Sequence, residues 1–170
     1  MKEILYNYDK LEEKDINKVV RRAKVLIMNP KDEFLVVLSH HNYFLIGGRV
    51  EDNETYDECL VREVKEEAGI TLPMEEREPF LVIRHLCKGY PTENDNTEYI
   101  AKYFCIKADI VPDMSQIELT DDEKDGNFHL EYIHKDEVIK KLEDSLETCT
   151  RDMPVKDTIQ VIKEYLNMNK

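Results

Sequence analysis

The sequence predicts an α/β fold in which one mixed β-sheet is covered by helices on both faces. Segments rich in β-branched and aromatic residues recur between residues 19 and 133, as expected of strands. An amphipathic helical segment interrupts them between residues 55 and 69, and two more helical segments end the chain. Strands that bracket helices in this order are typical of a sheet with helices packed on each side.

The first half of the chain predicts a β-hairpin. Residues 19–28 form its first strand, residues 29–32 (Asn-Pro-Lys-Asp) its turn, and residues 34–38 its second strand. A short strand resumes at residues 43–46, just before two glycines. Residues 1–17 fit either a short strand, because apolar residues alternate near their start, or an N-terminal extension of a single domain that spans the chain.

Two adjacent histidines, His40 and His41, interrupt the first half of the chain. Adjacent residues on a strand point to opposite faces, so these side chains would not bind one metal ion together. We therefore interpret residues 39–42 as a polar loop.

The second half of the chain predicts another hairpin, a last strand and two helices. Residues 89–96 form the polar, turn-rich loop of this hairpin. Apolar residues recur at helical spacing in both C-terminal segments, which gives each helix one buried face. The predicted strands cover residues 80–87, 98–110 and 128–133, and the predicted helices cover residues 135–146 and the chain from about residue 154.

Composition and charge exclude several classes of function. The 170 residues carry 24 basic and 37 acidic side chains, a net charge of −13. Long nucleic acids are bound through Lys and Arg, so we expect no such partner. No apolar run reaches membrane-spanning length and the N-terminus shows no signal-peptide pattern, so we expect no membrane partner. The chain has four cysteines, none of which forms a C-x-x-C pair: Cys59, Cys87, Cys105 and Cys149. This pattern predicts reduced thiols in a cytoplasmic protein.

Residues 48–70 form the stretch around which the other elements are arranged. Two glycines allow a backbone turn, and Thr55 or Asn53 then caps a helix, with Glu58 placed to complete a capping box. Gly69 ends this helix. The apolar residues of the helix fall on one stripe, which we expect to be buried: Leu60, Val61, Val64 and Ala68.

The opposite face of this helix carries converging carboxylates. Glu63, Glu66 and Glu67 lie at positions i, i+3 and i+4, so their side chains share one face. Glu63 and Glu67 would repel each other by about 0.2–0.5 kcal/mol in an isolated helix. A hard divalent cation would convert that repulsion into attraction, and Mg²⁺ prefers a few carboxylates together with waters and substrate phosphates. Arg62, four residues from both Glu58 and Glu66, is placed to orient one of them.

This stretch resembles the Nudix box. Gly48, Glu54 and the run from Arg62 to Ile70 (REVKEEAGI) match the box pattern without a mismatch, which by chance occurs at about one in 10⁸ start positions. Ile46 stands before the two glycines, where the family usually has proline. The resemblance implies a Nudix-type α/β/α sandwich. It also implies that the protein hydrolyses a small-molecule substrate, a nucleoside diphosphate linked to another moiety, with Mg²⁺ or Mn²⁺.

The resemblance also implies roles for individual residues of the box. The carboxylates would hold the metal, the arginine would hold a carboxylate in place, and Glu66 is our choice of general base. The implied catalytic residues are Glu66, Glu63 and Arg62, the metal ligands are Gly48 (through its carbonyl), Glu63, Glu66 and Glu67, and the scaffold residues are Glu54 and Gly69.

The general base and the substrate contacts have alternatives outside the box. Family members also use an acidic residue on a distant loop as the base, and the candidates here are Glu98, Asp122, Glu123 and Asp125. Side chains that would stack on a base or contact a phosphate are Tyr43, Phe44, Arg49, Arg84 and Tyr90.

Two other interpretations compete with the hydrolase. One is a catalytically inactive Nudix-fold module that binds or regulates, and the other is a Nudix-like isomerase of isoprenoid diphosphates. The complete set of three box glutamates with Arg62 favours the hydrolase. The sequence indicates neither the particular diphosphate nor the number of metal ions, and it leaves the oligomeric state open, a homodimer included.

Overall fold

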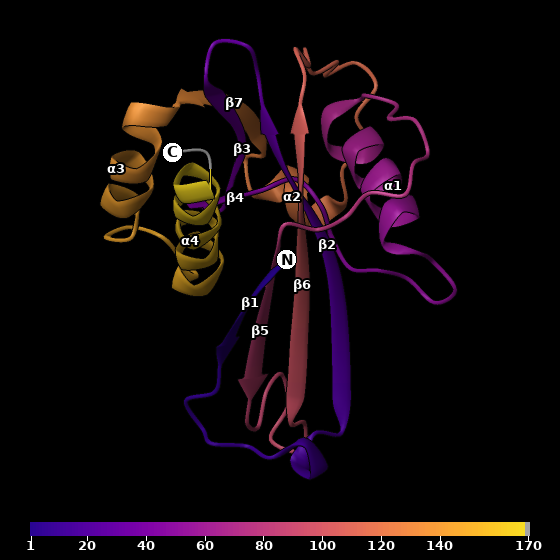
Figure 1. Cartoon of the computed structure of the whole chain (residues 1–170), viewed down its shortest axis with the longest axis vertical. Coiled ribbons are helices and arrows are strands. Elements are labelled where there is room, and N and C mark those ends of the chain that lie inside the picture. The colour runs from indigo at the N-terminus through magenta and orange to yellow at the C-terminus, as the bar shows by residue number, and fades with distance from the viewer. Residues whose placement is uncertain (169–170) are drawn as a thin grey trace.

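The computed structural model describes residues 1–168 and contains one mixed sheet of seven strands within that range (Figure 1). The strands follow the order β1-β5-β6-β2-β3-β4, and β7 pairs with β3. The pairs β1–β5 and β2–β6 are parallel, whereas the other pairs are antiparallel. The predicted mixed sheet is therefore confirmed.

The elements have the following bounds. The strands are β1 (Lys2–Tyr6), β2 (Lys18–Met28), β3 (Glu33–Ser39), β4 (Asn42–Phe44), β5 (Leu81–Cys87), β6 (Thr97–Lys107) and β7 (His129–His134). The helices are α1 (Tyr56–Ala68), α2 (Asp121–Asp125), α3 (Lys135–Ser145) and α4 (Asp152–Met168), with a short 3₁₀ turn, η1, at Glu13–Asp15.

Both predicted hairpins form, with shifted ends. The β2–β3 and β5–β6 pairs are antiparallel, as expected. The strand predicted for residues 98–110 ends at Lys107, and the strand predicted for residues 43–46 is β4, which ends at Phe44. The last helix begins at Asp152 rather than near Pro154. The ambiguous N-terminus contributes β1, which adds a parallel strand to β5 and so belongs to the sheet.

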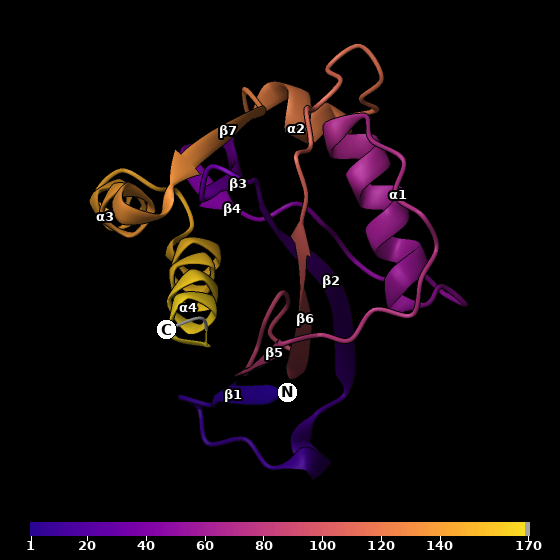
Figure 2. The same ribbon diagram turned by 45° about the horizontal axis from the view of Figure 1, so that its top comes forward.

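Helices cover both faces of the sheet, with α1 on one side and α3 and α4 on the other (Figure 2). Alternation along β2 explains this arrangement, because successive side chains of a strand point to opposite faces. Val25 packs in the cluster that contains Leu60 of α1, whereas Leu26 packs in the cluster that contains Ile162 of α4. Complete burial of Leu60 stabilises the fold by about 2–3 kcal/mol. This is the predicted α/β/α sandwich.

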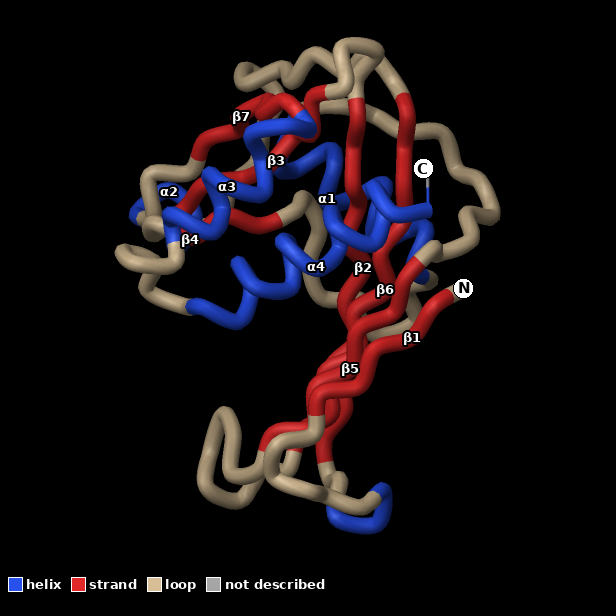
Figure 3. Tube along the Cα trace, turned by 60° about the vertical axis from the view of Figure 1, so that its left-hand side comes forward, coloured by secondary structure: helices blue, strands red, loops and turns tan. Residues whose placement is uncertain are grey.

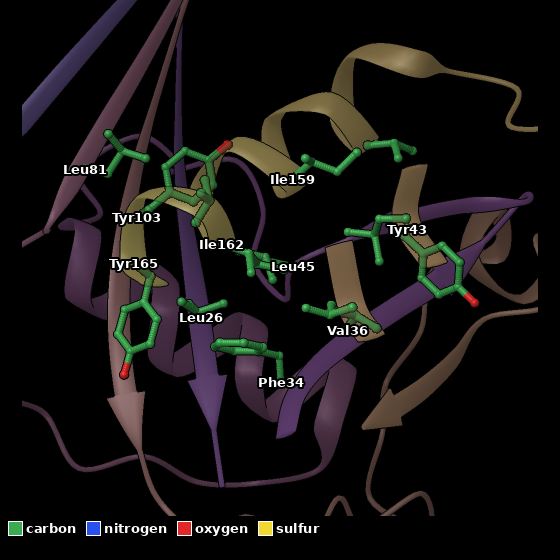
Figure 4. Close-up of a cluster of buried hydrophobic side chains, with 14 of the residues drawn as sticks. Leu26, Phe34, Val36, Tyr43, Leu45, Leu81, Tyr103, Ile159, Ile162 and Tyr165 are labelled. Atoms are coloured by element: carbon green, nitrogen blue, oxygen red, sulfur yellow. The ribbon is translucent and has the colours of Figure 1, made fainter. Parts of the chain in front are cut away.

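The core under α4 is an interlocked set of aliphatic and aromatic side chains (Figure 4). Phe34 of β3 meets Tyr165 of α4 edge to face, with ring centroids 5.7 Å apart. Edge-to-face pairs of this kind add stability beyond the area that they bury. This contact fixes α4 across the sheet.

The strands β1, β2, β5 and β6 extend past the N-terminal end of α4 (Figures 1 and 3). The part of the sheet beyond the beginning of α4 is thus not covered by α4. None of the helices in residues 1–168 is both long and apolar enough to span a membrane.

Candidate active site

A cavity of about 1230 Å³ runs from the glutamates of α1, across β2 and β6, to the beginning of α4. One end is lined by the box residues and by the segment that contains α2. The other end is lined by tyrosines and a histidine of β5 and β6 and by the first turns of α4. Residues Arg22 and Lys24 of β2 lie between the two ends.

The path of the backbone after β4 brings the two glycines to α1. Leaving β4, the chain turns away from β3 and runs beside β2, where the amides of Val25 and Ala23 donate to the carbonyls of Ile46 (2.9 Å) and Gly48 (3.1 Å). Gly47 has a φ of +126°. A side chain at Gly48 would place its Cβ 2.0 Å from Glu63 Oε1, so only glycine allows this close approach.

Local capping fixes the ends of α1. The Glu58 amide donates to Thr55 Oγ1 at 3.2 Å, and the Thr55 amide donates to the Glu58 carboxylate at 2.7 Å, which confirms the predicted capping box. Gly69 ends the helix with a φ of +71°. Because Glu58 serves the cap, it is Glu66 and not Glu58 that Arg62 contacts along the helix.

Arg62 connects the loop to the carboxylates of the helix. Its guanidinium donates to both carboxylate oxygens of Glu54, from Nε at 2.8 Å and from Nη2 at 3.1 Å. Nη1 donates to Glu63 at 2.7 Å and to Glu66 at 3.3 Å, and Nη2 donates to the Arg49 carbonyl at 3.1 Å. The hydrogen bond from Arg62 lowers the pKa of the Glu54 carboxyl.

The three box glutamates lie at one end of the cavity in a crowded negative environment. Glu63 and Glu67 are 8% and 3% exposed. Burial raises the pKa of Glu67 to about 8, with the charges of Glu63 and Glu123 contributing and the charge of Lys24 opposing the shift. Burial also raises the pKa of Glu66, with Glu63 and Glu123 again contributing. A carboxylate from α2 therefore faces the box carboxylates.

The donor set at this end fits a divalent cation in its chemistry, although it does not form a finished coordination sphere. Within residues 1–168, no group of three or more His, Cys, Asp or Glu side chains is close enough to hold a metal ion as arranged. Arg62 instead bridges Glu63 and Glu66, whose oxygens lie within 3.3 Å of its Nη1. Carboxylate oxygens beside open space are the ligands that Mg²⁺ prefers. The Gly48 carbonyl accepts a hydrogen bond from the Ala23 amide at 3.1 Å and a long, weak one from the Cys59 thiol at 3.9 Å, which a ligand could replace.

Of the candidate bases outside the box, two line the cavity. Asp122 and Glu123 do so, whereas Asp125 does not. Glu98 lies on the α1 side of the sheet next to Arg84, whose Nε donates to it at 2.6 Å, and it does not line the cavity. The structure thus brings Glu123, and not Glu98, to the box glutamates.

His40 holds α2 in this position. His40 and His41 form the tight turn between β3 and β4, both with positive φ, whereas Ser39 and Asn42 of the predicted loop belong to these strands and are buried. The His40 amide donates to the Gly126 carbonyl at 2.7 Å, and its ring Nε2 lies 2.9 Å from the Asp122 carbonyl. These contacts at both ends of α2 place Glu123 beside the cavity.

The predicted substrate contacts divide into two groups. Phe44 and Tyr90 line the cavity. Tyr43 is a core residue, whose hydroxyl donates to Glu131 at 3.2 Å. Arg49 and Arg84 also lie outside the cavity lining, and Arg84 pairs with Glu3 and Glu98 on the other side of the sheet.

Sequence reasoning missed several residues of the cavity. Alternation along residues 18–28 already places Arg22 and Lys24 on one side of a strand, which was a usable signal. The contribution of β5, β6 and α4 needed the parallel β2–β6 register, which no local pattern reveals. The missed residues include Arg22, Lys24, His85, Tyr99, Tyr103 and Asp157.

Comparison with known proteins identifies the family. A model described as NUDIX domain matches residues 18–152, which include the whole box. This chain belongs to the NUDIX domain family. Its class of enzyme is that of the Nudix pyrophosphohydrolases. No curated protein matches the sequence of this Nudix chain.

Solved structures similar to this Nudix chain share its fold at low sequence identity. A NUDIX hydrolase from Nitrosomonas europaea has a TM-score of 0.62 and 17% identity over 88% of this chain and 90% of its own. A MutT protein from Methanosarcina mazei Go1 has a TM-score of 0.55 and 20% identity over 88% and 96%. A MutT NUDIX hydrolase from Burkholderia pseudomallei has a TM-score of 0.53 and 18% identity over 71% and 86%.

Proposed function

We propose that this Nudix protein hydrolyses the diphosphate linkage of a nucleoside diphosphate joined to another moiety, with Mg²⁺ or Mn²⁺ as cofactor. The observation that carries the proposal is the convergence of Glu63, Glu66 and Glu67 on one end of a cavity large enough for such a substrate. Glu123 of α2 lines the same cavity.

Glu63, Glu66 and Glu67 would hold the metal, with the Gly48 carbonyl beside Glu63 as a further donor. A bound divalent cation neutralises diphosphate oxygens and makes a bound water more acidic. Arg62 keeps Glu63 and Glu66 aimed at the cavity by donating to both.

Glu66 accepts the proton of the attacking water in this proposal. It is the most exposed of the three box carboxylates. Its raised pKa lies closer to neutral pH than that of a free glutamate, which suits a general base. Glu123 is the second candidate, but its Oε2 already accepts from the amide (2.7 Å) and the hydroxyl (2.8 Å) of Thr120. Two short hydrogen bonds to one oxygen stabilise the ionised carboxylate more than the single 3.3 Å bond from Arg62 to Glu66 Oε2, so Glu123 is the poorer base.

Two cations of β2 would meet the phosphates. Lys24 Nζ donates to the Leu45 carbonyl at 3.0 Å and to the Gly47 carbonyl, next to the box glutamates. The Arg22 side chain has no hydrogen bond or ion pair within the described residues and lines the cavity next along the strand. Anionic oxygens are the partners that a free guanidinium binds best.

The four cysteines are free, which supports a location in a reducing compartment, the cytoplasm.

The activity is tested by incubating nucleoside diphosphate derivatives with the protein and resolving the products by chromatography. Cleavage between the two phosphates is expected. A protein that binds these compounds without turnover would instead be an inactive module, and rearranged isoprenoid diphosphate would indicate the isomerase.

A further inference from the structure

The end of the cavity away from the box glutamates is a built aromatic site. We call it the tyrosine end and define it by six residues: His85, Tyr90, Tyr99, Ala101, Tyr103 and Asp157. The strands that carry most of it, β5 and β6, extend past the beginning of α4 (Figure 1). The register places Tyr99 opposite His85, and both side chains point to the α4 side of the sheet.

Tyr103 brings an unpartnered hydroxyl to this site. The residue is 5% exposed and lines the cavity, and its hydroxyl has no hydrogen-bond partner in residues 1–168. The hydroxyl is not sealed in the core, because its oxygen is still partly accessible from the cavity. A mostly buried hydroxyl is costly to leave unpaired, and this one is available to pair with a ligand that enters the cavity.

Asp157 and His85 supply a second, rigid polar group. His85 Nε2 lies 3.0 Å from both carboxylate oxygens of Asp157, and the other side of the imidazole is stacked on Tyr6 at a centroid distance of 4.9 Å. Tyr103 and Asp157 line the same cavity, one from β6 and the other from α4. A hydroxyl and a carboxylate acceptor are therefore both available to a ligand in the tyrosine end.

The open side of the tyrosine end is an aromatic wall. The rings of Tyr90 and Tyr99 are 6.1 Å apart between centroids, and Tyr90 is 54% exposed. The small side chain of Ala101 leaves room between Tyr99 and Tyr103 on β6. Arg22 is the register partner of Ala101 and so stands at the junction with the glutamate end.

We propose that the tyrosine end binds the nucleobase of the substrate, with Tyr99 stacked on the base and with Tyr103 and Asp157 bonded to its edge. Arg22 contacts the phosphate next to the nucleoside. The inference rests on the proposed function in one respect only: the proposed function places the remaining phosphates of the substrate at the box glutamates. A planar base uses both the aromatic wall and the donor and acceptor groups, whereas an aliphatic group would leave the polar groups unpaired and a second phosphate would face Asp157.

The spacing of the two ends supports this assignment. Lys24, Arg22 and Val20 follow one another on the same side of β2 and are the register partners of Tyr103, Ala101 and Tyr99, so Tyr99 is the residue of the tyrosine end farthest from Lys24 along these strands. Four residues of a strand span about 13 Å. A nucleoside bound at Tyr99 thus extends its phosphates past Arg22 toward Lys24 and the box glutamates.

The experiment uses ligands that the proposed activity does not cleave. Nucleoside 5′-monophosphates of the four common bases contain no diphosphate linkage, and ribose 5-phosphate lacks the base. Binding of each ligand to the whole chain is measured by titration calorimetry, with melting curves to confirm folding. The variants are Tyr99→Ala, Tyr103→Phe and Arg22→Ala, and Tyr132→Phe, whose hydroxyl bonds the Ile110 carbonyl away from the cavity, is the matched control.

We expect at least one nucleotide to bind about tenfold or more tightly than ribose 5-phosphate. Tyr99→Ala should weaken that nucleotide by about 5- to 150-fold, and Tyr103→Phe by about two- to tenfold, without affecting ribose 5-phosphate. Arg22→Ala should weaken both ligands by the same factor, and Tyr132→Phe should weaken neither.

Equal binding of ribose 5-phosphate and every nucleotide would show that the site takes a sugar and would overturn the assignment. Unchanged nucleotide binding in the folded Tyr99→Ala and Tyr103→Phe variants would overturn it as well. Nucleotide binding of the expected pattern without hydrolysis of any diphosphate would sustain this inference and reject the proposed function. Hydrolysis of a diphosphate, combined with unchanged nucleotide binding in the Tyr99 and Tyr103 variants, would sustain the proposed function and reject this inference.

Discussion

Arg62 and Glu54 form a two-point ion pair, Nε to Oε1 at 2.8 Å and Nη2 to Oε2 at 3.1 Å, which ties the loop before α1 to the helix itself. The loop carries Gly48, and the helix carries the glutamates. The same guanidinium bonds Glu63 and Glu66. One residue therefore keeps the loop and the carboxylates in register, and it acts on the reaction through them.

The Arg62→Ala substitution should destabilise the metal-free protein by about 2–3 kcal/mol. Glu54 and Arg62 are 12% and 27% exposed at the side chain, so the loss leaves a mostly buried carboxylate without its partner. Solvent screening keeps the cost below that of a fully buried pair. Melting curves in chelator give the measurement, and Arg21→Ala, an exposed arginine of the same strand as Arg22, is the control. A variant as stable as wild type would contradict the scaffold role.

The Glu67→Gln substitution should leave the metal-free protein as stable as wild type or slightly more stable. Burial, together with the charges of Glu63 and Glu123, disfavours the ionised carboxylate more than Lys24 favours it, and the amide removes that cost. The same change should reduce the rise in melting temperature caused by millimolar Mg²⁺, because binding to the folded state alone stabilises it. The exposed Glu137→Gln is the control for the loss of one charge. A much lower melting temperature of Glu67→Gln in chelator would refute this account of the helix.

The stability contribution of Glu54 should depend on pH in a defined direction. Arg62 lowers the pKa of Glu54 in the folded protein below the value of about 4.3 in the unfolded chain. The stabilisation is therefore fully present above about pH 4.3 and is lost as the pH falls through the folded-state pKa. The difference in unfolding free energy between wild type and Glu54→Gln should shrink below pH 4. The exposed Glu147→Gln should show no such trend, and a constant difference for Glu54→Gln would disprove the linkage.

The Glu123→Gln substitution should lower kcat by less than about tenfold, since its carboxylate caps α2 at Thr120 rather than accepting a proton. Asp125→Asn, on the same helix but outside the cavity lining, is the matched control and should keep the wild-type kcat. A loss of about 100-fold in Glu123→Gln, with Asp125→Asn unaffected, would move the general base from the box to α2.

The sequence predicted the parts of the fold and site that local patterns determine. The capping box at Thr55, the stop at Gly69 and the shared face of Glu63, Glu66 and Glu67 depend on residues only a few positions apart. Leu60 and Val64 are fully buried, as their helical spacing required. The two hairpins and the mixed sheet followed from alternation and from the order of the elements.

The parts that depend on long-range contacts were not visible in the sequence. Glu98 and Glu123 were equal candidates, and only the β5–β6 register and the docking of α2 on His40 separate them. The tyrosine end needs β6, α4 and the parallel β2–β6 pair at once. The partner of Arg62 within the loop, Glu54, is eight residues away, beyond the i, i+4 spacing used to find helix pairs.

The central claim is that the box glutamates carry out metal-dependent hydrolysis of a diphosphate. Initial rates on the best substrate of a panel of nucleoside diphosphate derivatives test it most directly, with Mg²⁺ or with chelator, for wild type, Glu66→Gln and Glu98→Gln. Glu98 bonds Arg84 outside the cavity, so Glu98→Gln makes the same chemical change away from the site. We predict turnover that requires the metal, falls by at least about 100-fold in Glu66→Gln, and stays near wild type in Glu98→Gln. Metal-independent turnover, or turnover that survives in Glu66→Gln and disappears in Glu98→Gln, would contradict the account.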